Sequence, residues 1–234
     1  MAGTLYLGTS GFAYQEWKGS FYPDDLKDAE MLSFYVRRFP SVEINYTFRR
    51  FPAEKTLRTW GERATGEFRF ALKANQRITH TRRLRDADTD VSDFLDRARV
   101  LGDRLGPILF QCPPSLHFDR SLIEAFLAYL PPIARYAFEF RDDSWAQARD
   151  LLAEQGVAWC FAEWNETDAE PVISEPFAYL RLRRDEYADD QLRGWGERIS
   201  RALERGTDVY AYFKHESGTA APRHADRLKE LTAG

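Results

Sequence analysis

The chain has few of the residues that mark secreted, membrane-spanning or metal-dependent proteins. Its 234 residues include two cysteines and two methionines. Cys112 and Cys160 each lie in or at the end of an apolar run, so we expect buried, reduced thiols rather than a disulfide framework. No signal peptide precedes the first apolar run, and no run approaches the roughly 20 residues that span a bilayer. We therefore expect a soluble, cytoplasmic protein with no membrane partner.

The histidines form no pattern typical of a metal site. His80, His117, His215 and His224 are scattered, without a His-x-His or His-Glu-x-x-His spacing. We therefore predict no metal ligands, and the sequence identifies no cofactor. A catalytic thiol at Cys112 is the sharper alternative to a buried one, but no histidine has the local context to activate it. His215 with Glu216 is the one pair that lies at an expected strand end.

Charges of the two signs nearly balance. The formal net charge is −4 at pH 7, which gives no global attraction for nucleic acid or for an anionic membrane. The 33 lysines and arginines leave room for a local basic patch. Hydrophobic residues make up 44% of the chain, which is enough for a large core.

Eight short apolar runs recur along the chain, and most end in a charged or amide side chain. They cover residues 5–8, 42–45, 68–73, 108–111, 136–141, 157–163, 177–181 and 209–214. Strand-like runs alternating with helix-like segments predict a parallel sheet, and eight of them predict a closed barrel without exposed edges. The predicted fold class is α/β, a TIM-type (β/α)8-like barrel, in one domain over residues 1–234.

Apolar periodicity predicts helices between most of these strands. The clearest cover residues 25–39, 91–105, 144–155, 189–204 and 223–231. Residues 75–90 are charged and predict an exposed loop, with a short helix in it as the alternative. Residues 165–176, between the sixth and seventh strands, are acidic and contain proline, so we expect the helix there to be reduced or missing.

Polar side chains at the expected strand ends mark the candidate site. The strands of a parallel barrel end at one rim, where barrel enzymes place their working groups. Side chains two apart on a strand share a face, so Glu139 and Arg141 point the same way. The residues expected to converge at the rim are Glu43, Asn45, Lys73, Gln111, Glu139, Arg141 and Arg181.

Acids beside cations suggest proton transfer next to an anionic group. Glu139 or Glu43 would be the general acid/base, since burial can tune a glutamate toward neutral pH. A phosphate or carboxylate would be held by Lys73, Arg141, Arg181 and Lys214 and oriented by Asn45 and Gln111. The structural alternatives are that the pairs Glu139–Arg141 and Glu43–Lys73 only neutralise one another, and that the cations form a solvated rim.

The segment after the first strand is rich in small and aromatic residues. Its sequence Gly8-Thr9-Ser10-Gly11 either approaches a ligand closely or makes a tight turn. We do not expect a nucleophilic Ser10, because no Ser/His/Asp arrangement accompanies it. Tyr14 and Trp145 are candidates for stacking on a sugar or base, although such aromatic residues more often pack loops onto a barrel.

Several motifs run in order over nearly the whole chain. They are Gly8-Thr9-Ser10-Gly11-Phe12 with Tyr14, Trp17, Gly19 and Phe21-Tyr22-Pro23; Val42-Glu43-Ile44-Asn45 with Thr47-Phe48; Phe70-Ala71-Leu72-Lys73; Leu109-Phe110-Gln111 with Pro113-Pro114; Phe138-Glu139-Phe140-Arg141 with Trp145; Tyr179-Leu180-Arg181; and Val209-Tyr210-Ala211-Tyr212-Phe213. Together they resemble the YecE-like family, also called domain of unknown function 72. The resemblance implies a (β/α)8-like barrel with a polar pocket at the strand C-termini, and it supplies no settled activity.

Two departures from the family pattern fall at the expected rim. After Arg181 many relatives would carry a His-Gly pair, whereas Leu182-Arg183-Arg184-Asp185 follows here. After Phe213 many would carry two Asn-like residues, whereas Lys214-His215-Glu216 follows here. The departures suggest a different or more anionic ligand.

Three functions fit these features. The first is an enzyme, with hydrolysis the commonest fit, acting on a small polar or anionic molecule such as a sugar or phosphate ester. The second is a nucleic-acid binding or processing protein that uses Arg49, Arg50, Arg77, Arg82, Arg83 and Arg85. The third is a non-catalytic ligand-binding barrel.

Overall fold

The strands of the computed structural model close a barrel, as the sequence predicts. The structure describes residues 2–51, 53–163, 177–214 and 218–232. Eight strands follow one another around the barrel in chain order. They are β1 (Leu5–Ser10), β2 (Ser41–Ile44), β3 (Arg69–Lys73), β4 (Leu105–Gln111), β5 (Tyr136–Glu139), β6 (Ala158–Glu163), β7 (Ala178–Leu182) and β8 (Val209–Lys214).

The α-helices alternate with these strands. They are α1 (Met31–Tyr35), α2 (Tyr46–Arg49), α3 (Glu54–Arg63), α4 (Asp88–Ala98), α5 (Arg120–Ala128), α6 (Arg149–Glu154), α7 (Asp189–Glu204) and α8 (Ala220–Thr232). The predicted helix 25–39 is wrong in extent, because both of its ends adopt tighter turns. A 3-10 turn (Asp28–Glu30) precedes α1, and after α1 the backbone N–H of Arg38 donates an i,i+3 hydrogen bond to the carbonyl oxygen of Tyr35. The helix expected to be reduced, at residues 165–176, lies outside the described residues.

Two other predicted segments also differ. The helix predicted at 91–105 stops at Ala98, and a 3-10 segment (Arg99–Arg104) follows it, in which Gly102 has a φ of +52°. The helix predicted at 144–155 begins as a 3-10 helix (Asp143–Ala148) and continues as α6. The charged stretch 75–90 agrees in part with the short-helix alternative, because it contains a π-helix (Arg77–Thr81) and the start of α4.

The chain divides into two compact units. The first consists of Met1–Glu43, Arg63–Arg69 and Phe161–Gly234, and the second of Ile44–Glu62 and Phe70–Cys160. The single domain expected from the sequence stays a prediction.

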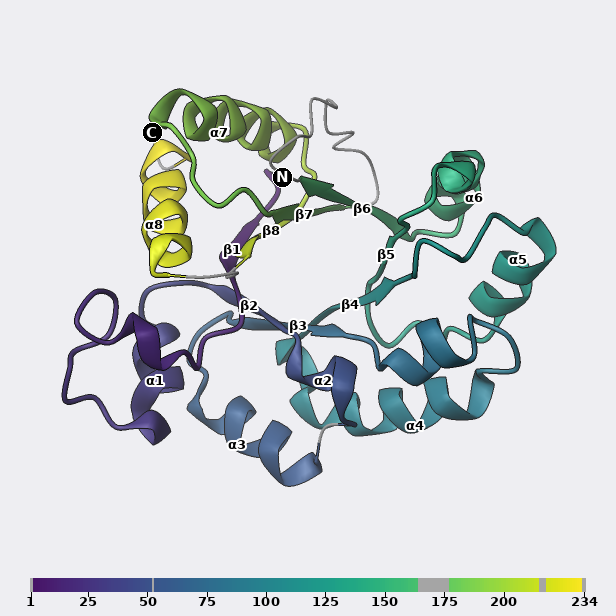
Figure 1. Cartoon of the computed structure of the whole chain (residues 1–234), viewed down its shortest axis with the longest axis horizontal. Coiled ribbons are helices and arrows are strands. Elements are labelled where there is room, and N and C mark those ends of the chain that lie inside the picture. The colour runs from purple at the N-terminus through teal and green to yellow at the C-terminus, as the bar shows by residue number, and fades with distance from the viewer. Residues whose placement is uncertain (1, 52, 164–176, 215–217, 233–234) are drawn as a thin grey trace. The chain divides into compact units, whose positions relative to one another are not determined.

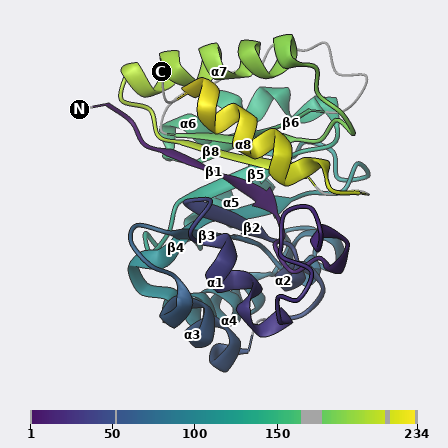
Figure 2. The ribbon, with the colours of Figure 1, turned by 90° about the vertical axis from the view of Figure 1, so that its left-hand side faces the viewer.

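In the first unit, β8 is the central strand. It pairs in parallel with β1 and with β7. Helices α7 and α8 pack against each other, and α8 lies across β1 and β8 (Figures 1 and 2). Ser10, the last residue of β1, aligns with Glu43 of β2 and with Lys214 of β8. These three residues therefore lie on one face of the sheet.

Glycine at position 8 allows β1 and β2 to approach closely. A Cβ atom on Gly8 would lie 2.0 Å from the carbonyl oxygen of Ser41 and 2.8 Å from the hydroxyl of Tyr35. The same hydroxyl accepts a hydrogen bond from the backbone N–H of Thr9 at 2.8 Å. The lack of a side chain at Gly8 thus sets the position of Ser10 at the end of β1.

In the second unit, β4 pairs in parallel with β3 and with β5. Phe110 of β4 and Phe138 of β5 pack against Phe126 of α5, with ring centroids 5.2 and 5.9 Å away. Side chains alternate along a strand, so Gln111 and Glu139 point away from α5, toward the inside.

Both cysteines are buried and free, as predicted. Burial raises the pKa of the Cys112 thiol, with a smaller contribution from the nearby Glu139 carboxylate. A thiol in that state is a poor nucleophile, which disfavours the catalytic alternative. Within the described residues, no helix is both long and apolar enough to cross a membrane.

Candidate functional site

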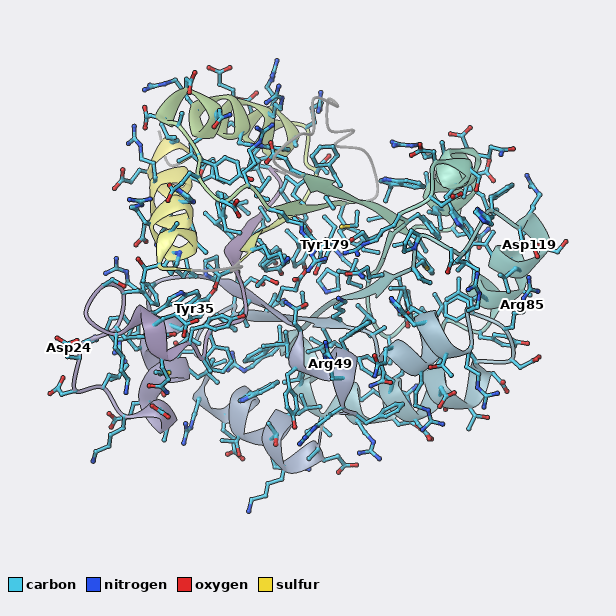
Figure 3. The ribbon with its side chains drawn as sticks, viewed as in Figure 1. Asp24, Tyr35, Arg49, Arg85, Asp119 and Tyr179 are labelled. Carbon is cyan, nitrogen blue, oxygen red and sulfur yellow. The ribbon has the colours of Figure 1, made fainter. Side chains whose placement is uncertain are left out.

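The first unit holds a buried carboxylate with three donors. Glu43 is 0% exposed. Its Oε1 accepts from Ser10 Oγ at 2.5 Å and from Arg181 Nη2 at 2.9 Å. Its Oε2 accepts from the hydroxyl of Tyr179 on β7 at 2.9 Å (Figure 3). We call Ser10, Glu43, Tyr179 and Arg181 the Glu43 cluster.

The members of the Glu43 cluster meet inside the ring of strands. Glu43 lies on β2 and Arg181 on β7, and the order of strands puts β8 and β1 between them. Side chains on strands that are not neighbours can meet only across the interior. Glu43 and Arg181 therefore both point into the interior.

The Glu43 carboxylate already accepts hydrogen bonds from three side chains, which limits the chemistry that this cluster can perform. Arg181 supplies the opposite charge, and the hydroxyl proton of Ser10 is engaged by the carboxylate. The hydroxyl of Tyr14 donates to the carbonyl oxygen of Ser10 at 2.8 Å. Burial, and then the Glu43 charge, raises the pKa of Tyr14 to about 12, so Tyr14 stays neutral. These contacts favour a role in fixing strand ends, and contact with a ligand stays a prediction.

The sequence analysis missed a second buried carboxylate in this unit. Glu163 ends β6 and is 6% exposed. It accepts from Arg184 Nε at 2.8 Å and from the Tyr187 hydroxyl at 2.5 Å. Arg184 belongs to the segment that departs from the family pattern, so part of that segment's charge is engaged by Glu163. The sequence feature that could have identified Glu163 is its position at the end of an apolar run.

The second unit brings together Gln111, Glu139 and Arg141. Gln111 and Glu139 are register partners on β4 and β5. Glu139 is 2% exposed, and its Oε1 lies 3.0 Å from Nε of Arg141, whose side chain is 30% exposed. An inward carboxylate and a partly open guanidinium therefore lie side by side.

Lys73 of β3 belongs to the same group. It is the register partner of Leu109, so it shares the face that carries Gln111. The Lys73 ammonium lies 4.0 Å from the ring centroid of Phe48 on α2, which is a cation–π contact. Thr47 Oγ1 donates to the Lys73 carbonyl oxygen at 2.6 Å and ties α2 to the end of β3. We call Lys73, Gln111, Glu139 and Arg141 the Glu139 cluster.

A histidine that the sequence analysis left unassigned lies beside this cluster. The π-helix carries His80, whose ring centroid is 5.1 Å from that of Phe48. Burial, and then the positive charges of Lys73 and Arg141, lowers the pKa of His80 from its ordinary value of 6.5. No spacing motif marks His80, and its segment is charged, so nothing in the sequence distinguishes it as a site residue.

The arginines considered for nucleic-acid binding are largely engaged. Arg77 and Arg82 both pair with the buried carboxylate of Asp90, at 2.9 and 3.2 Å. Arg85 pairs with Asp119 at 3.0 Å (Figure 3). Asp90 and Asp119 thus offset part of the positive charge that a phosphate backbone would need.

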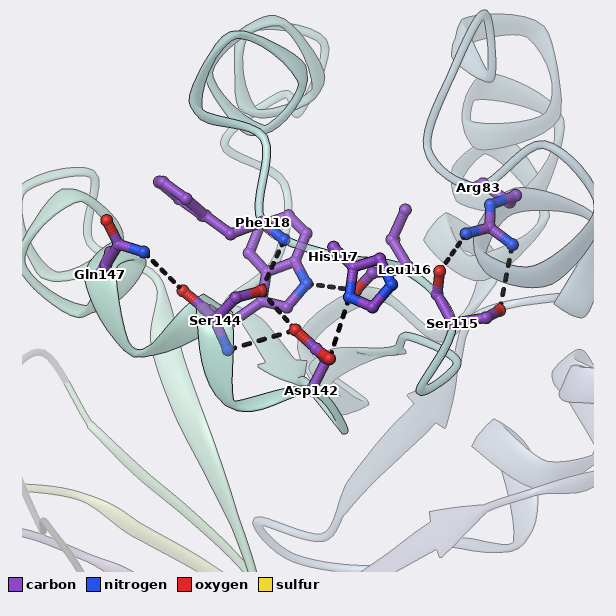
Figure 4. A network of polar contacts seen from close by, with 9 residues as sticks. Arg83, Ser115, Leu116, His117, Phe118, Asp142, Ser144 and Gln147 are labelled. Carbon is purple, nitrogen blue, oxygen red and sulfur yellow. Dashed lines mark hydrogen bonds and ion pairs between the residues drawn. The ribbon is translucent and has the colours of Figure 1, made fainter.

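The neighbouring loops are joined by a polar network (Figure 4). Arg83 donates to the side chain and to the carbonyl oxygen of Ser115. His117 Nδ1 lies 3.0 Å from Asp142 Oδ2, and Asp142 Oδ1 accepts from the backbone N–H of Ser144 at 3.1 Å. These contacts fix the turns that follow β4 and β5.

Trp145 is part of this packing. It is 0% exposed, and its Nε1 donates to the carbonyl oxygen of Leu116 at 2.6 Å. Its ring stacks on Phe140 with centroids 4.0 Å apart. The arrangement favours the packing alternative over stacking on a ligand.

For the other candidate site residues, the structure gives a position in the fold. Asn45 is half-buried and precedes α2, and Lys214 ends β8 as the register partner of Ser10. His215 and Glu216 lie outside the described residues. Convergence of all the candidates at one rim stays a prediction. The described residues contain no group of three or more His, Cys, Asp or Glu side chains that could hold a metal ion.

Solved structures resemble this chain over nearly its whole length. A DUF72 family protein from Thermotoga maritima MSB8 has a TM-score of 0.87 at 24% identity, covering 99% of this chain and 100% of that one. A DUF72 family protein from Enterococcus faecalis V583 has a TM-score of 0.80 at 15% identity, covering 99% and 96%. At these identities the likeness shows the fold alone.

Named relatives match as well. UPF0759 protein YecE of Escherichia coli K12 is 35% identical over 139 residues, covering 58% of this chain and 48% of that protein, so the match spans about half the relative's length. UPF0759 protein YunF of Bacillus subtilis 168 is 22% identical over 274 residues, covering 97% and 94%. The family model described as "Protein of unknown function DUF72" matches residues 6–234. This chain therefore belongs to the DUF72 family.

Proposed function

We propose that this protein is an enzyme acting on a small polar, anionic molecule at the C-terminal ends of β3, β4 and β5. The observation that carries the proposal is the inward, 2% exposed Glu139 beside Arg141. Glu139 would act as the general base, and Arg141 beside it would hold the anionic group of the substrate. Hydrolysis of an ester or glycoside is the reaction class that this set of groups fits best.

Each member of the Glu139 cluster has a distinct part in this proposal. Lys73 and Arg141 supply two fixed positive charges for the phosphate or carboxylate of the substrate. Gln111, in register with Glu139, supplies an amide that orients a hydroxyl or carbonyl group. Asn45 is a further orienting amide, and Lys214 a further cation, in the wider set predicted from the sequence.

Glu43 is the alternative acid/base, with Arg181 as the alternative anion ligand. Three donors already surround the Glu43 carboxylate. Proton transfer to it would require at least one donor to leave, which makes Glu139 the better candidate. Ser10 and Tyr14 would then position the loop after β1, and they would touch a substrate only through that loop.

The test is turnover of a panel of chromogenic phosphate, carboxylate and glycoside esters by purified protein. Glu139→Gln should reduce turnover of whichever substrate is found by about a hundredfold or more, while the thermal midpoint stays nearly unchanged. Glu124→Gln, in an exposed ion pair on α5, is the matched control and should retain full turnover. A large loss of stability in Glu139→Gln, with no substrate found, would instead support a purely structural ion pair.

Two alternative functions predict different experimental results. A non-catalytic binding barrel would show a ligand that shifts the melting temperature and is recovered unchanged. A nucleic-acid binding protein would retard oligonucleotides in a gel, with an affinity that falls steeply as salt rises. We expect no such retardation, because Asp90 and Asp119 engage the arginines of the 77–85 segment.

A further inference from the structure

His80 and Lys73 of the Glu139 cluster contact the same aromatic ring. The Phe48 ring is shared by both groups, with Lys73 Nζ at 4.0 Å from its centroid and the His80 ring centroid at 5.1 Å. The Phe48 and His80 rings are nearly perpendicular, at 81°. The imidazole is half-buried, so part of it remains open to a small molecule.

The local backbone fixes the histidine in this position. A π-helical turn is uncommon and is frequently found at functional sites. The Thr79 hydroxyl lies 2.8 Å from His80 Nδ1, which restrains one nitrogen and leaves Nε2 as the other polar atom of the ring. The charged groups nearby include Lys73 on β3, Arg141 after β5 with Glu139 paired to it at 3.0 Å, and Arg77 and Arg82 of the same segment, both ion-paired with Asp90 of α4.

We propose that His80 completes an oxyanion-binding site with Lys73 and Arg141, and that it takes up a proton when the anion binds. The proposal rests on the function proposed above and adds a third ligand to it. Burial, and then the positive charges of Lys73 and Arg141, lower the pKa of the imidazole in the free protein. A doubly charged oxyanion such as sulfate or a phosphate monoester adds negative charge beside these cations, beyond that of Glu139, and makes the imidazolium more favourable.

Protonation of His80 on anion binding has a chemical consequence. A protonated His80 donates a hydrogen bond to the bound anion, in addition to the bonds from Lys73 and Arg141. In the proposed site it would also be an acid, with Glu139 of the same cluster as the base. Ester hydrolysis uses an acid and a base together.

The experiment follows the titration of the histidine rings by NMR, with sulfate as the probe because it does not itself titrate near neutral pH. His80→Asn assigns the His80 signal, with His80→Gln as a second variant if the first does not fold. Sulfate should raise the pKa of His80 by about one unit, which corresponds to tenfold tighter sulfate binding when His80 is protonated. Chloride at matched ionic strength should not. His117, which is exposed and pairs with Asp142, is the internal control for nonspecific anion effects.

Variants of the cations complete the test. Lys73→Met should raise the pKa of His80 in the free protein and should abolish the response to sulfate. If sulfate shifts the signals of Lys73 and Arg141 but leaves the pKa of His80 unchanged, His80 is not part of the site and the proposed anion site survives. If sulfate affects neither the cations nor His80, the proposed anion site fails as well.

Discussion

The guanidinium of Arg181 lies 2.9 Å from the carboxylate of Glu43, although 138 positions separate the two residues in the chain. Both side chains are almost fully buried, at 2% and 0% exposed. Their contact joins β2 and β7 through the interior of the first unit. Neither charge can be solvated there if the other is removed.

We therefore expect Glu43→Gln and Arg181→Met each to lower the free energy of unfolding by about 3–5 kcal/mol, because each leaves a buried charge without its partner. Urea unfolding at neutral pH measures this. The matched control is Arg120→Met, which breaks the exposed pair with Glu124 and should cost less than about 1 kcal/mol. Equal costs in the buried and exposed pairs would contradict the expectation.

Tyr187→Phe removes only the hydroxyl that donates to Glu163 at 2.5 Å. A hydrogen bond to a charged, buried acceptor contributes about 1.5–3 kcal/mol, so we expect a loss of that size in the free energy of unfolding. Tyr129→Phe, at a tyrosine that is 49% exposed, is the control and should change stability by less than about 0.5 kcal/mol. A Tyr187→Phe protein as stable as the control would show that the contact contributes little.

Acid should destabilise the protein in part through His224. This ring is 4% exposed, and burial lowers its pKa from the ordinary value of 6.5, while Glu186 partly opposes the shift. Below about pH 6.5 the unfolded chain therefore binds a proton that the folded chain does not, so stability falls as the pH drops. The shift at His80 has the same sign.

His224→Gln should therefore show a smaller loss of unfolding free energy than wild type between about pH 7.5 and about pH 5.5. Urea unfolding at both pH values measures the difference. His117→Gln, at the exposed histidine, should follow the wild-type slope. If His224→Gln also follows that slope, the buried ring is not the source of the acid sensitivity.

Three residues before α4 adopt left-handed backbone angles without being glycine. Arg83, Leu84 and Asp86 have φ values of 54°, 65° and 46°. Glycine adopts this region freely, so we expect Asp86→Gly to be neutral or to stabilise by up to about 1 kcal/mol. Asp88→Gly, two positions on in the first turn of α4, should instead cost about 1 kcal/mol. Thermal or urea unfolding of the two variants compares them, and a reversed order would contradict the argument.

The sequence predicted the barrel because strand ends leave a local signal. Most of the apolar runs end in a polar residue, and alternation along β4 and β5 is enough to set Gln111 and Glu139 on the face opposite Phe110 and Phe138. Helix extents were less accurate. The segment after Ala98 and the segments around α1 adopt 3-10 turns, which have no distinct periodicity in the sequence.

The partners of the buried carboxylates could not be predicted in the same way. Which cation reaches Glu43 depends on which strands face each other across the interior, so Arg181 could not be separated from Lys73 by sequence alone. His80 was missed because the charged stretch around it predicted an exposed loop. In the structure, buried Ile78, Thr79 and Leu84 pack that stretch against the second unit.

Gly8 has a consequence for any library made from this protein. Alanine, the smallest replacement, already places an atom 2.0 Å from a backbone oxygen that no rotamer change can move. Saturation mutagenesis of this codon followed by selection for folded protein should thus return glycine almost alone. The absence of a methyl group at position 8 allows β1 and β2 to keep their spacing. A screen of this single codon can test that without knowledge of the substrate.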